Sequence, residues 1–149
     1  MLLLLFQAVS AIPSGAMLIY DPSGITIGFP RSILQDLQVN APFTNFLIPG
    51  LFLMIFLGLL PLLIVYGLIT KKNFKLMQTI NLYKNYHWSW TFSYYLGILL
   101  VLWICMQLYF GIGFGMLHFW YALLGVLIVV ATQWTSTKRD YYISDHSWE

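Results

Sequence analysis

The fold is decided by residues 46–70, which read FLIPGLFLMIFLGLLPLLIVYGLIT and contain no charged side chain. About 20 residues of helix cross the roughly 30 Å hydrocarbon core of a bilayer, so this segment is long enough to span a membrane. A membrane-spanning β-strand would instead alternate apolar and polar residues over about ten positions, and these residues do not alternate. The segment therefore predicts a transmembrane helix.

Three more stretches of the chain share this character. Of the 149 residues, 60% are hydrophobic and only 8% are charged, whereas soluble domains are about 25% charged. This composition excludes a water-soluble enzyme and predicts an all-α, polytopic membrane protein, with one transmembrane domain over residues 1–149. Its four transmembrane helices are expected in the long uncharged segments, at about residues 1–20, 46–70, 88–111 and 116–135.

Residues 1–16, MLLLLFQAVSAIPSGA, also have the short apolar run and the small residues of a signal peptide. They lack the basic segment that precedes such a run in signal peptides. We therefore expect these residues to be retained as part of the first transmembrane helix.

The basic residues predict how the chain lies across the membrane. Lys and Arg are enriched in short cytoplasmic loops. Six of the seven lie in the loop 71–87 or in the tail 136–149, whereas the loop 21–45 contains only Arg31. The pattern predicts a multi-pass protein of a bacterial cytoplasmic (inner) membrane with both termini in the cytoplasm. The loop 21–45 and the turn 112–115 then face outward, and the loop 71–87 faces inward.

Both longer loops contain segments that are expected to lie along the membrane surface. In the outer loop, Asp21, Pro22 and Gly24 fit a β-turn. Ser32 is expected to cap a short amphipathic helix that ends near Val39. A second amphipathic helix is expected in the inner loop, where lysines would meet anionic lipid headgroups. These headgroup contacts are predicted for Lys71, Lys72, Lys75 and Lys84.

Prolines and small residues predict how the helices bend and pack. Pro13 and Pro61 each remove a backbone hydrogen bond, so a kink is expected near both residues. Small residues let membrane helices approach closely. We therefore expect a compact bundle with close contacts at Ala8, Ala11, Gly15, Gly58, Gly97, Ala122 and Gly125.

Aromatic residues make up 18% of the chain, and many lie at the ends of the predicted helices. Trp and Tyr are enriched where lipid meets water, so these residues are expected to anchor the protein at both membrane surfaces. The predicted inner anchors are Trp88, Trp90, Tyr94, Tyr95, Trp134, Tyr141 and Tyr142. The predicted outer anchors are Tyr20, Tyr109, Trp120 and Tyr121.

The residues inside the spans offer little for catalysis. None is Asp, Glu, Lys or Arg, which disfavours a proton relay or an ion-coupled carrier. His87 and His118 are predicted at opposite membrane surfaces, too far apart to share a haem. His87 with His146 lacks the further ligands of a zinc site, and Cys105 is the single cysteine. We therefore predict no catalytic residue, metal site or cofactor, and the net charge of +2 disfavours nucleic acid as a partner.

The polar residues near the outer surface form the one candidate site. The amides in or near the spans are Gln7, Gln107 and Gln133, and buried amides of this kind usually link helices. Gln107 is predicted in the outer leaflet, beneath the loop 21–45. An outer-face polar pocket is therefore a candidate, formed by Asp21, Arg31, Asp36, Gln107 and His118.

Distinctive turn, proline and aromatic patterns lie along the chain. They are LIYDPSGITIGFP (18–30), PFTNFLIPG (42–50), HWSW (87–90), WICMQ (103–107) and RDYY (139–142). In these segments the chain resembles a family of small, uncharacterised bacterial membrane proteins with four predicted helices. The resemblance implies the four-helix fold and assigns no activity. A looser similarity to DoxX-like proteins, in size and helix number, identifies no site residue.

Three functions stay open from the sequence. The spans hold no charge, redox or nucleophile constellation, which favours an accessory or scaffolding subunit without catalytic activity of its own. Its expected partners are the lipid bilayer and either a larger membrane complex or further copies of the chain. The first alternative is a transporter or binder of an apolar or lipid-like molecule, in a cavity near Gln107. The second alternative is a membrane enzyme or a quinone-interacting subunit.

Overall fold

The computed structural model describes residues 1–143; residues 144–149, with His146 and the end of the predicted tail, lie outside the described residues. Four helical segments are long and apolar enough to cross a membrane, which confirms the predicted fold class. They are α1 (Leu2–Tyr20), the continuous segment α3 (Leu47–Phe52), η1 (Leu53–Leu59) and α4 (Leu60–Thr70), then α6 (Trp88–Tyr109) and α7 (Met116–Gln133).

Three short helices lie outside these spans: α2 (Arg31–Asn40), α5 (Lys75–Thr79) and α8 (Thr135–Asp140). The expected cap at Ser32 is wrong, because Pro30 occupies the N-cap position and α2 begins at Arg31. Pro30, at φ −58° and ψ 145°, already holds the extended backbone that precedes a helix. The inner-loop helix is only five residues long, and Lys84 Nζ donates to the carbonyl oxygens of Gln78 and Thr79 beside its C-terminal end.

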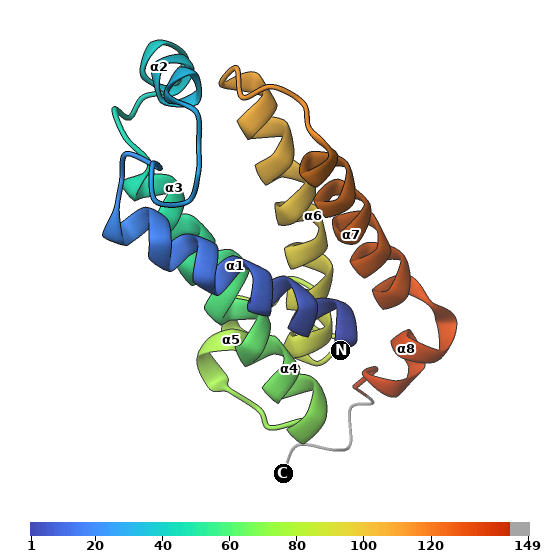
Figure 1. Cartoon of the computed structure of the whole chain (residues 1–149). Helices are drawn as coiled ribbons and strands as arrows, with labels where there is room; N and C mark the ends of the chain where they lie inside the picture. Colours follow the sequence, from blue (N-terminus) through green and yellow to red (C-terminus); the bar gives the residue numbers. More distant parts are fainter. Residues whose placement is uncertain (144–149) are drawn as a thin grey trace.

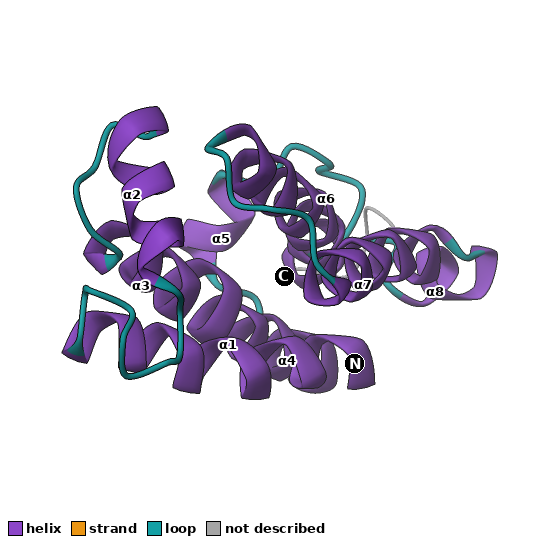
Figure 2. Ribbon diagram, turned by 45° about the horizontal axis from the view of Figure 1, so that its top comes forward, coloured by secondary structure: helices purple, strands orange, loops and turns teal. Residues whose placement is uncertain are grey.

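The long helices form two pairs that meet at one end and separate toward the other (Figure 1). One pair is α1 with the α3–η1–α4 segment, and the other is α6 with α7. The pairs meet where α4 packs against α6, near α5 and α8, and we call this the α5 end. The opposite end, which we call the α2 end, carries α2 and the connection between α6 and α7. Figure 2 shows the same two pairs from nearer the α2 end.

Glycines allow close contact within each pair. A Cβ added at Gly15 of α1 would lie 2.8 Å from the backbone nitrogen of Met54, so no larger residue fits there without movement. In the other pair, a Cβ at Gly97 would lie 2.8 Å from the carbonyl oxygen of Gly125, and the reverse distance is also 2.8 Å. The close contacts predicted at these glycines are confirmed, each within a helix pair.

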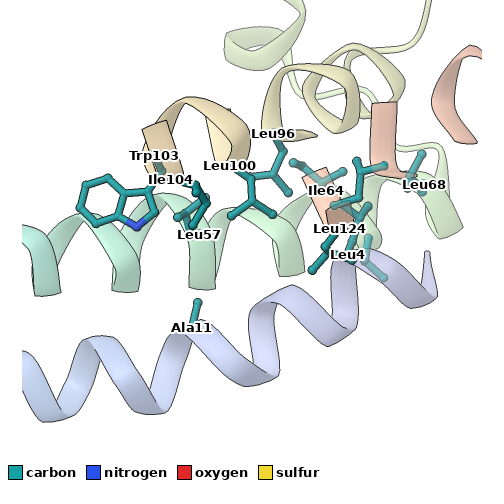
Figure 3. Close-up of a cluster of buried hydrophobic side chains, with 12 residues drawn as sticks. Leu4, Ala11, Leu57, Ile64, Leu68, Leu96, Leu100, Trp103, Ile104 and Leu124 are labelled. Atoms are coloured by element: carbon teal, nitrogen blue, oxygen red, sulfur yellow. The ribbon is translucent and has the colours of Figure 1, made fainter. Parts of the chain in front are cut away.

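The main apolar core joins the two pairs from the α5 end to beyond the middle of the spans, as far as Trp103 of α6. Leu57 and Ile64 of the first pair are fully buried, as are Leu96 and Leu100 of α6. Figure 3 shows Leu4 of α1 beside Leu124 of α7, and Ala11 of α1 pointing toward Leu57. This core holds the two pairs together from the α5 end as far as Trp103, whose ring stacks on that of Phe52 with centroids 4.5 Å apart.

Side chains of Trp88, Trp90 and Tyr141 close the α5 end, where the Tyr141 hydroxyl donates to the carbonyl oxygen of Leu68 at 2.9 Å. Trp88 Nε1 donates to the carbonyl oxygen of Lys72 at 2.9 Å, and Trp90 Nε1 donates to that of Thr132 at 2.8 Å. These two tryptophans are 0% and 2% exposed, so their predicted role as lipid anchors is wrong. Each indole buries its ring while its N–H satisfies a backbone carbonyl near a helix end. Trp134, by contrast, is 65% exposed.

The backbone departs from α-helical geometry before Pro61. Residues Leu53–Leu59 form the π-helix η1, in which Leu60 N–H donates to the carbonyl oxygen of Ile55, five residues earlier. Short π-helical turns inside α-helices are frequent at functional sites. The first span, by contrast, continues through Pro13 as the single helix α1.

Candidate functional site

A cavity of about 620 Å³ lies between the two helix pairs, toward the α2 end. This volume falls within the range of about 300 to 1,000 Å³ that is typical of ligand sites. The apolar core closes its deep end, because core residues of η1 and α6 also line the cavity. Its apolar wall residues include Ala11, Leu18, Leu53, Leu57, Leu100, Trp103 and Ile104.

The loop between α1 and α3 covers the α2 end of the cavity. Ile33, Leu37, Phe43 and Phe46 of this loop line the cavity, and we call them the roof. Leu37 and Phe46 are buried in a second apolar cluster with Leu18 of α1, which fixes the roof on the first helix pair. The Phe43 ring also meets the ring of Phe110, the C-cap residue of α6, edge-on, with centroids 5.6 Å apart. The roof therefore bridges both pairs.

The cavity reaches the protein surface at the start of α7. Met116 and Leu117 line it, yet they are 73% and 71% exposed. α1 and α7 share the apolar core through Leu4 and Ile128, near the α5 end. Toward the α2 end both helices line the cavity from opposite sides. The two pairs separate in this direction (Figure 1). The exposure of Met116 and Leu117 places the surface opening at the start of α7.

One face of α1 supplies a row of polar side chains to the cavity, Gln7, Ser10 and Ser14, which we call the α1 polar stripe. Their spacing of three and four residues places them on one side of a helix. Ser10 Oγ donates to the carbonyl oxygen of Gln7 at 2.9 Å, and Ser14 Oγ donates to that of Ser10 at 3.0 Å. Both hydroxyl hydrogens are therefore used within α1.

Gln7 is the deepest polar group of the cavity wall, with 1% of its surface exposed. Its Nε2 donates to the carbonyl oxygen of Leu57 on η1 at 3.4 Å. Its Oε1 is buried and has no hydrogen-bond partner within the described residues. A buried amide oxygen without a partner costs about 1 to 3 kcal/mol, so this oxygen favours a ligand that can donate to it.

Gln107 and His118 line the cavity from α6 and α7, nearer the α2 end. His118 Nδ1 accepts a hydrogen bond from Gly115 N–H at 3.1 Å. In the neutral ring the proton is then on Nε2, which can donate. The cavity thus has an unpartnered acceptor at its deep end and donors nearer its α2 end.

Two of the five residues predicted for the outer pocket line the cavity. Gln107 and His118 line the cavity, whereas Asp21, Arg31 and Asp36 are not among the described residues that line it. Asp21 is engaged in its own turn, where its two carboxylate oxygens accept from Ser23 Oγ at 2.6 Å and Thr26 N–H at 2.9 Å. These hydrogen bonds hold the pKa of the Asp21 carboxyl well below its usual range.

The four inner-loop lysines lie at the α5 end in two different settings. Lys71 Nζ donates to the carbonyl oxygen of Asp140 at 3.0 Å and lies 5.1 Å from the centre of the Tyr141 ring. Lys84 binds the carbonyls beside the end of α5, as described above. Lys72 and Lys75 are exposed, as are Lys71 and Lys84. The headgroup contacts stay a prediction for all four lysines.

The α1 polar stripe is not among the predicted site residues. The signal was present, since residues 7, 10 and 14 share a helical face. No Asp, Glu, Lys or Arg of the described chain lines the cavity. Within residues 1–143, no group of three or more His, Cys, Asp or Glu side chains is placed to hold a metal ion. The arrangement suits the binding of an uncharged, largely apolar molecule.

The fold and the cavity define a helical membrane protein with a ligand-sized apolar site. Comparison of the chain with models of protein families, with curated protein sequences and with solved structures found no match. The function is therefore argued from the cavity of this chain alone.

Proposed function

We propose that the protein binds an apolar or lipid-like molecule, taken from the membrane, in the cavity between α1 and α7. The observation that carries this proposal is the cavity of about 620 Å³, which is free of charged lining residues in the described chain and opens at Met116 and Leu117. Charged or strongly polar molecules would lose their hydration in such a site without gaining a partner of opposite charge.

The position of the opening supports uptake from the bilayer. An apolar ligand that passes from lipid into an apolar cavity changes one hydrocarbon environment for another, so binding requires little desolvation. Selectivity then depends on the few polar groups of the lining, of which Gln7, Gln107 and His118 are the principal ones. The roof, with its contact between Phe43 and Phe110, separates the ligand from the solvent outside the α2 end of the cavity.

The proposal includes a location in a bacterial cytoplasmic membrane with the α5 end in the cytoplasm. Six of the seven basic residues belong to the segments at the α5 end, as the enrichment of Lys and Arg in cytoplasmic loops requires. Labelling with a membrane-impermeant reagent tests the orientation. In a C105A background, a cysteine placed by Ser32→Cys should react from outside intact cells, and one placed by Asn85→Cys should not; the opposite pattern would reverse the orientation.

The accessory or scaffolding role, in a larger complex or among further copies of this chain, stays a prediction. α7 is the least enclosed span, with 22% of its most apolar window buried inside the protein. Its exposed face includes Phe119, Val126, Leu127 and Val130. A face of this kind suits either lipid or a partner helix.

The test is to fill the cavity and count bound molecules. Ser14 is half-buried and lines the cavity, so Ser14→Trp places a large side chain in the ligand's space. Ala16→Trp is the matched control, because Ala16 is exposed on the same helix and is not among the lining residues. Native mass spectrometry of full-length protein released from bilayer nanodiscs should show one retained lipid-like molecule on the wild type and on the control. The Ser14→Trp variant should lose it.

Two results would contradict the proposal. One is a wild-type protein that retains no lipid-like molecule. The other is equal retention by all three proteins, which would place any bound lipid on the outer surface rather than in the cavity. Unfolding transitions of both variants, measured in the same detergent, confirm that each protein is folded.

A further inference from the structure

We infer that the ligand of the cavity is an uncharged long-chain alcohol lipid whose hydroxyl donates a hydrogen bond to Gln7 Oε1. This inference rests on the proposed function and adds the chemical class of the ligand. The inference is based on Pro61, on the Leu57 carbonyl oxygen that needs a donor, and on the Gln7 amide, whose Oε1 has no partner among the described residues.

Because of Pro61, the carbonyl oxygen of Leu57 lacks the backbone donor that a regular helix provides. Pro61 has no N–H, so it donates neither to the carbonyl oxygen of Leu57, four residues earlier in an α-helical register, nor to that of Phe56, five residues earlier in the π-helical register of η1. A carbonyl freed in this way inside a membrane must find another donor. Gln7 Nε2 is that donor, at 3.4 Å from the Leu57 oxygen.

The Leu57 carbonyl in turn determines the orientation of the Gln7 amide, with Nε2 toward Leu57 and Oε1 on the other side. The amide must direct its nitrogen toward the Leu57 carbonyl, because the reversed amide would set two oxygens against each other. The Oε1 atom is then left without a partner in a side chain that is 99% buried and lines the cavity. An amide oxygen only accepts, so the ligand group that satisfies it must carry a hydrogen.

The neighbouring residues supply no such hydrogen. The hydroxyl hydrogens of Ser10 and Ser14 are both bound to carbonyl oxygens of α1. Viewed from the cavity, these hydroxyls therefore offer acceptor lone pairs, like Gln7 Oε1. A ligand hydroxyl near this stripe would donate to Gln7, whereas the oxygens of a quinone, a ketone or an ether only accept and would leave Oε1 unpartnered.

The absence of charge in the lining narrows the class further. An anionic phosphate or a cationic amine would be buried without a counter-ion, because no Lys, Arg, Asp or Glu of the described chain lines the cavity. A neutral hydroxyl on an apolar chain meets both conditions. It donates to Gln7 Oε1 and adds no charge.

A matched pair of probes tests the inference. Tritiated 1-dodecanol and 1-methoxydodecane share the same chain, but only the alcohol donates a hydrogen bond. Binding to full-length protein in nanodiscs is measured by scintillation proximity, with dissociation constants expressed per mole fraction of probe in lipid and with the signal of Ser14→Trp subtracted. The wild type should bind the alcohol about tenfold more tightly than the ether, the effect expected when a buried acceptor gains or lacks its donor.

A Gln7→Met variant removes the acceptor while keeping an unbranched side chain of similar length. Its preference for the alcohol should fall below twofold, with the affinity for the ether unchanged, and this unchanged affinity shows that the variant is folded. If the variant does not fold, the ratio measured on the wild type still decides. Equal affinity of the wild type for both probes overturns the alcohol assignment but leaves the proposed function standing. Binding of neither probe above the Ser14→Trp signal contradicts the proposed function itself.

Discussion

At the scale of single residues, His87 shows how this chain uses a side chain whose chemistry suggested a ligand. His87 is the N-cap of α6, and its Nδ1 accepts from the backbone N–H of Ser89 at 3.3 Å and lies 2.8 Å from Ser89 Oγ. The ring is only 4% exposed. Burial lowers the pKa of His87 below its ordinary value of 6.5, against the opposing effect of hydrogen bonds to the backbone of Lys72 and Lys71. The structure therefore assigns His87 a capping role that requires the neutral ring.

This role predicts how stability depends on pH. Because the folded-state pKa is lowered, the unfolded chain takes up a proton at a higher pH than the folded protein does. The contribution of His87 to the free energy of unfolding is thus fully present above about pH 6.5 and declines as the pH falls below that value. The thermal unfolding midpoint in detergent should decrease between pH 7.5 and pH 5.0.

His87→Asn is the informative variant, because asparagine caps helices well and does not titrate in this range. The variant should remain folded and should lose much of the decrease between pH 7.5 and pH 5.0. If wild type and variant show the same slope with pH, His87 does not require its neutral form in the fold.

At the scale of elements, glycine decides how closely α6 and α7 pack. A Cβ at Gly97 would lie 2.8 Å from the Gly125 oxygen and 3.0 Å from the Val129 nitrogen, both of them backbone atoms that no rotamer change can move aside. Gly97→Ala should therefore push the two helices apart and lower the free energy of unfolding by about 1 to 3 kcal/mol, as overpacking does.

Gly113→Ala provides the control, because a Cβ at Gly113 would meet no atom within 4 Å. It should change the free energy of unfolding by less than about 0.5 kcal/mol. Unfolding by sodium dodecyl sulfate, followed by circular dichroism, measures both variants. A Gly97→Ala protein as stable as the wild type would show that the helices are not packed backbone to backbone at this point.

Charge and small residues made the elements predictable from the sequence. The cost of placing a charge in lipid confines the charged residues to the loops and ends, so uncharged segments locate the spans. The same cost says nothing about which aromatic residues face lipid. Trp88 and Trp90 are buried because their N–H groups bind carbonyls of Lys72 and Thr132, which lie far away in the sequence.

The candidate site was less predictable, for a physical reason that Pro61 illustrates. Proline signals a lost backbone hydrogen bond, but the sequence does not say where the freed carbonyl finds a donor. The donor to the Leu57 carbonyl oxygen is Gln7, fifty residues away from Leu57 in the chain. Leu57 itself lies in the π-helix η1. Gln107 and His118 are predicted from their place near the outer end of the spans, and both line the cavity. The acceptor at Gln7, by contrast, depends on the packing of α1 against η1.

At the scale of the whole molecule, the two helix pairs explain why a cavity exists at all. Each pair is tightly packed by its own glycines, and the pairs are joined by the apolar core, which runs from the α5 end as far as the stacked rings of Phe52 and Trp103. Toward the α2 end they separate, and the roof crosses from one pair to the other through Phe43 and Phe110. Sequence patterns describe each helix by itself and therefore predicted a compact bundle, whereas the separation arises from how the pairs meet.

The most direct test of this account is an experimental structure of the full-length protein in lipid nanodiscs. The account predicts an elongated non-protein density between α1 and α7, beneath the roof, with its polar end within hydrogen-bond distance of Gln7 Oε1. A structure in which α1 and α7 pack against each other along their whole length, with Ser14 in contact with Tyr121 and no density between the pairs, would contradict it.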